Sequence, residues 1–223
     1  MLDFFNMLTK GGVVMIPLAI CSLAAVTVLI ERVMVLRQAS VDTDLLVKSI
    51  HSCIRSGNLA GALEGCRATP GPVAAVLESG ISAALSGGDV EEAMDETALA
   101  QVPVLERRLV VLDTVTTIAP LLGLLGTVVG MISSFHILAL SGTQHPAGIT
   151  AGIAEALIAT GTGLVIAIFS LVGFNWCQER VRTISQEIER RAVQVASWLK
   201  NIDKSTFERP ETRSRSEISL GAN

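Results

Sequence analysis

One carboxylate, Glu155, lies inside a long apolar stretch that carries no other charge, from about residue 149 to residue 175. An ionised side chain at membrane depth costs about 2.5–3.5 kcal/mol, so such residues usually face a bundle interior or water. A carboxylate in this position can take up and release protons, which makes Glu155 a candidate for an ion pathway. A second interpretation is also open, in which Glu155 pairs with another chain or lies near the membrane interface.

A stripe of small and polar residues runs along the preceding apolar stretch. Its members recur at alternating steps of three and four residues, and the positions between them are mostly Leu, Val and Ile. Such steps return to the same side of a helix, so one face is small and polar while the rest is apolar. The stripe consists of Asp113, Thr116, Pro120, Gly123, Thr127, Gly130 and Ser134.

Two roles are consistent with the composition of this stripe. Gly126 and Gly130 form a G-x-x-x-G pattern, and small residues of this kind let membrane helices approach closely. In the second role, the hydroxyl groups line a polar passage, to which Pro120 adds a backbone carbonyl left without its partner one turn earlier. The residues expected to pack helices are Gly123, Gly126, Gly130, Pro120 and Gly163.

The composition of the chain excludes several classes of protein. Of the 223 residues, half are apolar, only 17% are charged and 4% are aromatic, and the charges are segregated from the apolar stretches. This is typical of a polytopic membrane protein with a polar domain. The net charge of -4, without a basic patch, predicts no binding of nucleic acid. The four cysteines show neither C-x-x-C pairs nor zinc spacing, so we expect no metal and no cofactor.

Three stretches are long enough to cross a membrane, which takes about 20 apolar residues for about 30 Å of hydrocarbon. No small-residue cleavage site follows the first of them, so we interpret it as a retained helix rather than a signal peptide. We therefore expect an all-α polytopic membrane protein. Its predicted segments are an N-terminal arm (1–12), a first span (13–30), a helical domain (31–112), a second span (113–140), a hairpin (141–148), a third span (149–175), a further helix (176–204) and a disordered tail (205–223).

The basic residues predict how these segments are oriented. Residues 31–112 contain seven Lys and Arg residues and residues 176–223 contain nine, whereas the hairpin contains none. Cytoplasmic loops are rich in Lys and Arg. We therefore expect the helical domain and the C-terminus in the cytoplasm, and the N-terminus and the hairpin in the periplasm.

The expected cytoplasmic segments show helical patterns. Apolar residues recur at helical spacing over 41–54, 59–66 and 73–85, and a longer helix is expected over 90–112, with Pro103 as a candidate kink. After the third span, an amphipathic helix is expected to present one apolar face. That face is formed by Val181, Ile184, Ile188, Val193 and Trp198.

Two motifs resemble the MotA/TolQ/ExbB proton channel family, and its ExbB/TolQ branch in particular. The sequence APLLGLLGTVVGMISSF (119–135) is similar to the second-helix signature of that family. The sequence IAEALIAT (153–160), followed by GTGLVIAIFSLVGFN (161–175), is similar to the third-helix signature. A supporting match is SGNLAGALEGC (56–66), and the resemblance as a whole covers about residues 10–200.

The resemblance implies a proton-driven motor rather than an enzyme. A ring of five copies of this chain would surround the transmembrane helices of two ExbD/TolR-like single-span partners, which carry a membrane aspartate. Protons would cross the inner membrane of a bacterium through this assembly and turn the ring relative to the partner pair. The partner would then pass force to a periplasmic protein similar to TonB or TolA. Carried over residue by residue, Thr127, Glu155 and Thr160 match the polar pore positions of the family.

Some features of the sequence depart from the family pattern. Phe169 stands where the family usually has proline, so the expected kink of the third helix is in question. Thr160 lies about 140° around a helix from Glu155, whereas Thr162 nearly eclipses it. Thr162 is therefore a further candidate for the pathway, together with Thr116 and Ser134. The main alternative function is a structural membrane scaffold that conducts no ions, in which the small residues and Glu155 serve only assembly.

Overall fold

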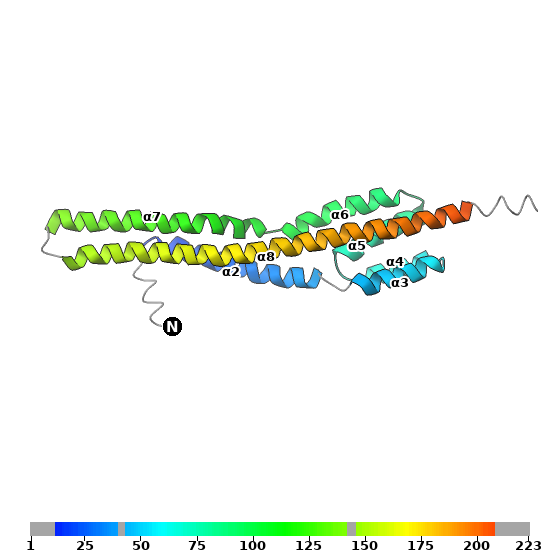
Figure 1. The fold of residues 1–223 in the computed structure, drawn as a ribbon, viewed down its shortest axis with the longest axis horizontal. Coiled ribbons are helices and arrows are strands. Elements are labelled where there is room, and N and C mark those ends of the chain that lie inside the picture. The colour runs from blue at the N-terminus through cyan, green and yellow to red at the C-terminus, as the bar shows by residue number, and fades with distance from the viewer. Residues whose placement is uncertain (1–11, 40–42, 142–145, 208–223) are drawn as a thin grey trace, which may run out of the picture. The chain divides into compact units, whose positions relative to one another are not determined.

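The computed structural model describes residues 12–39, 43–141 and 146–207, and the regular structure within these ranges is entirely helical. Three stretches of this part of the chain, which contain α2, α7 and most of α8, are long and apolar enough to cross a membrane. Both findings agree with the all-α class and the three spans expected from the sequence. The helices are α2 (Met15–Ala39), α3 (Thr43–Arg55), α4 (Leu59–Ala68), α5 (Pro72–Ser86), α6 (Val90–Glu106), α7 (Leu109–Ser141) and α8 (Pro146–Phe207), as drawn in Figure 1.

The chain divides into two compact units. The span unit comprises Met1–Val35 and Glu106–Glu179, and it contains most of α2, all of α7 and the first half of α8. The polar unit comprises Leu36–Leu105 and Arg180–Asn223, and it contains α3 to α6 and the second half of α8. Most of the predicted arm (1–12), the centre of the hairpin (141–148) and most of the tail (205–223) lie outside the described residues.

In the span unit, α7 and α8 are antiparallel neighbours, and Figure 1 shows them side by side. Their contacts run in opposite directions along the two helices. Gly163 lies against the backbone of Ala119, where an added methyl group would be 2.5 Å from the carbonyl oxygen. Further along α7 but earlier in α8, Gly130 lies against Ala156. The seam between the two helices is therefore built from residues with little or no side chain.

Helix α2 lies along α8 and runs in the same direction. The side chain of Leu29 fills the space beside Gly173, where an added methyl group would lie 2.7 Å from Leu29 Cδ1. At the other end of α2, Gly12 lies against the side chain of Glu155. The sequence offset between the helices is nearly the same at both contacts, as parallel neighbours require. Because α7 runs the opposite way, the three helices alternate in direction, which is the pattern that three successive membrane crossings need.

The buried face of α7 is rotated slightly from the predicted stripe. Gly123, Gly130 and Ser134 belong to both, but elsewhere the residue before the predicted one is buried. A pattern of steps averaging 3.5 residues drifts around a helix that has 3.6 residues per turn. As a result, Thr116 and Thr127 lie half-buried at the edge of the face. The buried face consists of Leu112, Val115, Ala119, Gly123, Gly126, Gly130 and Ser134.

The single helix predicted over 90–112 is wrong, because the chain breaks between α6 and α7. Helix α6 ends at Glu106, and Arg108 in the connection has a φ of 63°. Residues other than glycine rarely adopt this left-handed conformation, which commonly ends a helix. The Arg108 guanidinium forms an ion pair with Glu31 of α2, which helps to offset the strain. Pro103 lies within α6, shortly before its end.

The third span and the helix after it, predicted as 149–175 and 176–204, form one continuous helix. Helix α8 passes through Phe169 without interruption, and the Phe169 side chain is 73% exposed. Proline at this position would remove a backbone hydrogen bond and bend the helix. Phenylalanine removes no such bond, which is consistent with the unbroken helix.

In the polar unit, α4 packs against both α3 and α5, and Gly80 of α5 makes room for the side chain of Met94 in α6.

The apolar face predicted for the C-terminal helix is only partly correct, because Val193 is 67% exposed. At 3.6 residues per turn, the face that begins at Val181 passes through position 192 rather than 193. The buried face of this part of α8 consists of Val181, Ile184, Ile188, Ala192, Val195, Ala196 and Leu199.

Candidate ion pathway in the span unit

Glu155 lies near the start of α8, half-buried, at one edge of the helix face that packs on α7. The residue after it, Ala156, is fully packed against Gly130. A methyl group added at Gly130 would lie 2.8 Å from Ala156 Cβ and 2.8 Å from the carbonyl oxygen of Gly152. Only glycine permits such an approach of two backbones. The seam therefore fixes the backbone of α8 beside Glu155, and the carboxylate projects from its edge.

The Glu155 carboxylate lies against the backbone of Gly12, just before α2 begins. A methyl group added at Gly12 would overlap Glu155 Oε1, and it would lie 2.8 Å from Cδ and 3.4 Å from Cγ. All three helices of the span unit thus meet near Glu155. Val14, two residues after Gly12, is buried and approaches Gly126 of α7.

Thr160 lies on the opposite edge of the packed face from Glu155. Its hydroxyl donates a hydrogen bond of 2.8 Å to the carbonyl oxygen of Gly123, which links α8 to α7. Thr162 is on the same side as Glu155, but its hydroxyl donates back to Ile158 of its own helix, at 2.8 Å. Thr160 therefore bridges two helices, whereas Thr162 lies on the same side of α8 as Glu155.

Two candidate threonines of α7 form hydrogen bonds within their own helix. Thr116 and Thr127 each donate to a carbonyl of the preceding turn, Leu112 at 2.9 Å and Leu124 at 2.6 Å. Both residues are half-buried, so their oxygen atoms lie beside the seam rather than inside it. Pro120 is half-buried on the same edge.

Ser134 differs from the other hydroxyl residues of α7, because it is buried and joins two helices. Its Oγ lies 3.0 Å from the Gly130 carbonyl of its own helix and 3.1 Å from the Ile149 carbonyl of α8. The structure therefore places Ser134 against the start of α8 and Thr160 against Gly123. It places the Glu155 carboxylate against Gly12.

Two residues of the span unit have no counterpart among the sequence candidates. Gly12 was missed because its contact with Glu155 joins segments that are distant in the sequence, and no local pattern marks such a contact. Ser170 was missed because its position is otherwise apolar. Its Oγ is buried and has no hydrogen-bond partner among the described residues.

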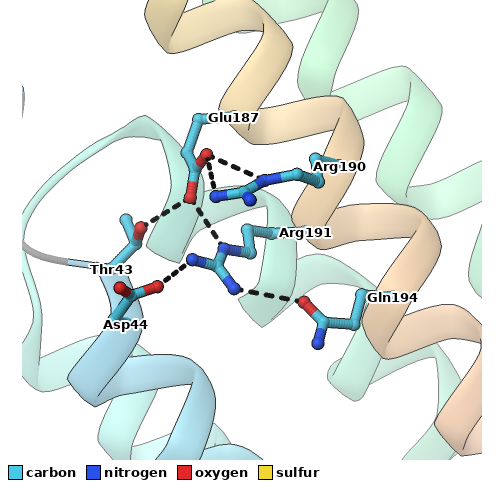
Figure 2. A network of polar contacts seen from close by, with 6 residues as sticks. All are labelled: Thr43, Asp44, Glu187, Arg190, Arg191 and Gln194. Carbon is cyan, nitrogen blue, oxygen red and sulfur yellow. Dashed lines mark hydrogen bonds and ion pairs between the residues drawn. The ribbon is translucent and has the colours of Figure 1, made fainter.

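A second polar cluster lies in the polar unit and is drawn in Figure 2. Arg191 of α8 is 8% exposed, and its guanidinium donates to Glu187 at 2.7 Å and forms an ion pair with Asp44 of α3. Thr43 also donates to Glu187, at 2.9 Å. These contacts fasten α3 to α8, beside a groove of about 250 Å³. We call this group (Thr43, Asp44, Glu187, Arg190, Arg191 and Gln194) the arginine cluster.

The arginine cluster changes the electrostatics of Glu187. Burial alone would raise the pKa of this carboxyl, but hydrogen bonds from Arg191, Thr43 and Arg190 outweigh it and hold the pKa below its usual value. Glu187 is therefore an ionised structural anchor and not a proton carrier near neutral pH. Among the described residues, no group of His, Cys, Asp and Glu side chains is arranged to hold a metal ion.

Comparison with known proteins identifies the class to which these features belong. The sequence model of the MotA/TolQ/ExbB proton channel family matches residues 68–190. These residues include α7, its seam with α8 and Glu155. The chain belongs to this family. It lies in the ExbB/TolQ-like branch, because the related proteins carry those names.

Three relatives illustrate the extent of the similarity. An ExbB-like protein of Synechocystis sp. is 35% identical over 171 residues, which cover 74% of this chain and 80% of that protein. The biopolymer transport protein ExbB of Aquifex aeolicus is 41% identical over 78 residues, 35% of this chain and 53% of its own length. The Tol-Pal system protein TolQ of Haemophilus influenzae is 39% identical over 97 residues, 43% of this chain and 42% of its own length.

Proposed function

We propose that this chain is the proton-conducting subunit of a membrane motor, and that Glu155 takes part in the proton pathway. The proposal rests on one observation above all. A carboxylate inside a stretch that is long and apolar enough to cross a membrane is half-buried at the junction of three helices, where small residues bring their backbones together. A carboxylate that served only to make the protein surface polar would not need a seam of closely packed helices beneath it.

The hydroxyl groups beside the seam support the same function. Thr127 and Thr162 are half-buried residues at its edges, where their oxygen atoms can offer acceptors to a chain of water molecules. A proton pathway needs a titratable group together with such polar neighbours. Thr160 contributes differently, because its bond to Gly123 holds α7 and α8 in register.

The working assembly is a homopentameric ring around a single-span partner of the ExbD/TolR type that carries a membrane aspartate. In this arrangement the N-terminus is periplasmic, the polar unit is cytoplasmic and the protein lies in the bacterial inner membrane. Large apolar side chains are exposed on both α7 and α8, Leu124 and Phe169 among them, and these surfaces suit contacts with lipid and with neighbouring subunits. Proton flow then drives work on a TonB- or TolA-like protein.

A reconstitution experiment tests this function. The chain and its single-span partner are placed in liposomes, and proton uptake is measured after a potential is imposed. We expect flux that requires both proteins and that falls in Glu155→Gln and in Thr127→Val. The alternative of a structural scaffold predicts normal assembly without flux, and unchanged flux in both variants would refute the pore assignments.

A further inference from the structure

The backbone at Gly12 occupies an unusual conformation at the point where the chain enters α2. Its φ is +71°, in the left-handed region that favours glycine. Its carbonyl oxygen accepts a hydrogen bond of 3.1 Å from the N–H of Met15, so Gly12 opens the turn that leads into the helix. The position of this backbone is therefore tied to α2.

The atoms nearest to the space that a side chain would take at Gly12 all belong to one residue. The three atoms nearest to an added methyl group are Oε1, Cδ and Cγ of Glu155. Other left-handed glycines of the chain differ in this respect. Gly57 and Gly87 have a φ of +74°, and nothing lies within 4 Å of an added methyl group at either. Backbone geometry alone thus explains glycine at those two positions, whereas Gly12 also has to leave room for a carboxylate.

Glu155 is held from two sides as a result. On one side, Ala156 and Ala159 pack into Gly130 and Gly126 of α7, which fixes the helix that carries Glu155. On the other side, the Gly12 backbone limits where the carboxylate can lie. A side chain with several rotatable bonds would otherwise sample many positions at the edge of the seam.

We propose that Gly12 is a positioning residue for Glu155, and that its missing side chain sets the location of the carboxylate within the ion pathway. The placement itself rests on the contact between the two residues. Its importance for conduction rests on the proposed function above. Any side chain at position 12 should drive the carboxylate out of its place and towards the open side of the seam.

Carbodiimide labelling tests the placement without any measurement of transport. The full-length protein in membranes is treated with dicyclohexylcarbodiimide, and the modified Glu155 peptide is quantified by mass spectrometry. We expect Glu155 to be labelled severalfold faster in Gly12→Ala than in the wild type. Gly57→Ala is the matched control, because it imposes a similar backbone strain where no neighbour is close, and it should leave the rate unchanged. An unchanged or slower rate in Gly12→Ala, or an equal acceleration in Gly57→Ala, overturns the inference.

Proton flux then tests the positioning role, through rescue by a shorter side chain. In the protein that keeps Glu155, Gly12→Ala should lower proton flux by roughly tenfold or more, since moving a reacting group by about 1 Å can lower a rate by that factor. In the Glu155→Asp background, whose carboxylate ends one carbon earlier, the same change should cost much less. An equal loss in both backgrounds overturns the positioning role. Flux that survives Glu155→Gln contradicts the proposed function instead, because that result does not involve Gly12.

Discussion

At the scale of single residues, two acidic side chains of α8 show how surroundings decide the use of a carboxylate. Glu187 in the polar unit receives hydrogen bonds from two arginines and a threonine, which keep it ionised. Glu155 in the span unit lies instead against a glycine backbone and a seam of small residues. The first is suited to an anchor, and the second is the group that we propose as a proton carrier.

A cysteine of the polar unit provides a residue-scale prediction about reactivity. Cys66 of α4 is 2% exposed, and burial, assisted by the nearby Glu78 carboxylate, raises the pKa of its thiol to about 11. Since thiolates react and thiols do not, we expect Cys66 to resist maleimide at pH 8 until the protein is unfolded. Mass spectrometry of the labelled peptides measures this, and rapid labelling of the native protein would contradict the packing around α4.

The same thiol predicts a pH dependence of stability. The folded protein keeps the Cys66 proton up to a pKa of about 11, whereas an ordinary thiol loses it near 9.0. The free energy of unfolding should therefore fall as the pH rises between these two values. In Cys66→Ala this part of the alkaline loss should disappear, and circular dichroism at a series of pH values would show whether it does.

At the scale of elements, the seam between α7 and α8 makes a prediction about two glycines. At Gly130, an added methyl group would lie 2.8 Å from both Ala156 Cβ and the Gly152 carbonyl oxygen, whereas at Gly161 nothing lies within 4 Å. Gly130→Ala should therefore cost about 1–3 kcal/mol of stability, as overpacking does. Gly161→Ala should be neutral or slightly stabilising, because alanine favours a helix over glycine. Denaturation in mixed micelles measures both, and equal effects would contradict the seam.

The arginine cluster makes a second prediction at this scale. In Arg191→Met, Glu187 loses a buried donor and Asp44 its ion-pair partner, which should cost about 2 kcal/mol of stability. The matched control is Arg190→Met. The Arg190 side chain is 65% exposed, so this substitution should cost less than about 1 kcal/mol of stability. Thermal unfolding of the purified variants provides the measurement, and equal losses would show that burial of Arg191 is unimportant.

The acid side of the stability profile checks the same cluster. The pKa of Glu187 is lower in the folded protein than in the unfolded chain. Its contribution to stability is therefore complete above the ordinary carboxyl pKa and is lost as the pH falls through the lower folded value. Arg191→Met should weaken this acid dependence, since it removes a hydrogen bond that lowers the pKa.

Much of the element scale could be predicted from the sequence, because apolar periodicity and uncharged length report directly on buried faces and spans. The helices over 59–66 and 73–85 follow from that pattern and agree with α4 and α5. The break at Arg108 could not be predicted in this way, since apolar residues continue through it. Neither could the contact of Gly12 with Glu155, because it depends on how α2 packs and no local pattern encodes it.

At the scale of the whole molecule, the alternating directions of α2, α7 and α8 are those of a chain that crosses a membrane three times. Membership in the MotA/TolQ/ExbB proton channel family agrees with this arrangement. In the proposed ring, Glu155 of each copy belongs to a pathway shared with neighbouring subunits and with the partner. The function is therefore a property of the assembly, and it has to be measured there.

The proposed role of Glu155 as a proton carrier is measured most directly by comparing ion flux through two assemblies. Wild-type chain and Glu155→Gln are each reconstituted with the single-span partner at equal protein content, and uptake of protons and of sodium is followed in parallel. We expect uptake of protons but not of sodium in the wild type, and loss of proton uptake in Glu155→Gln, whose assembly remains intact. Proton uptake by Glu155→Gln at the wild-type rate would contradict the proposed role of Glu155.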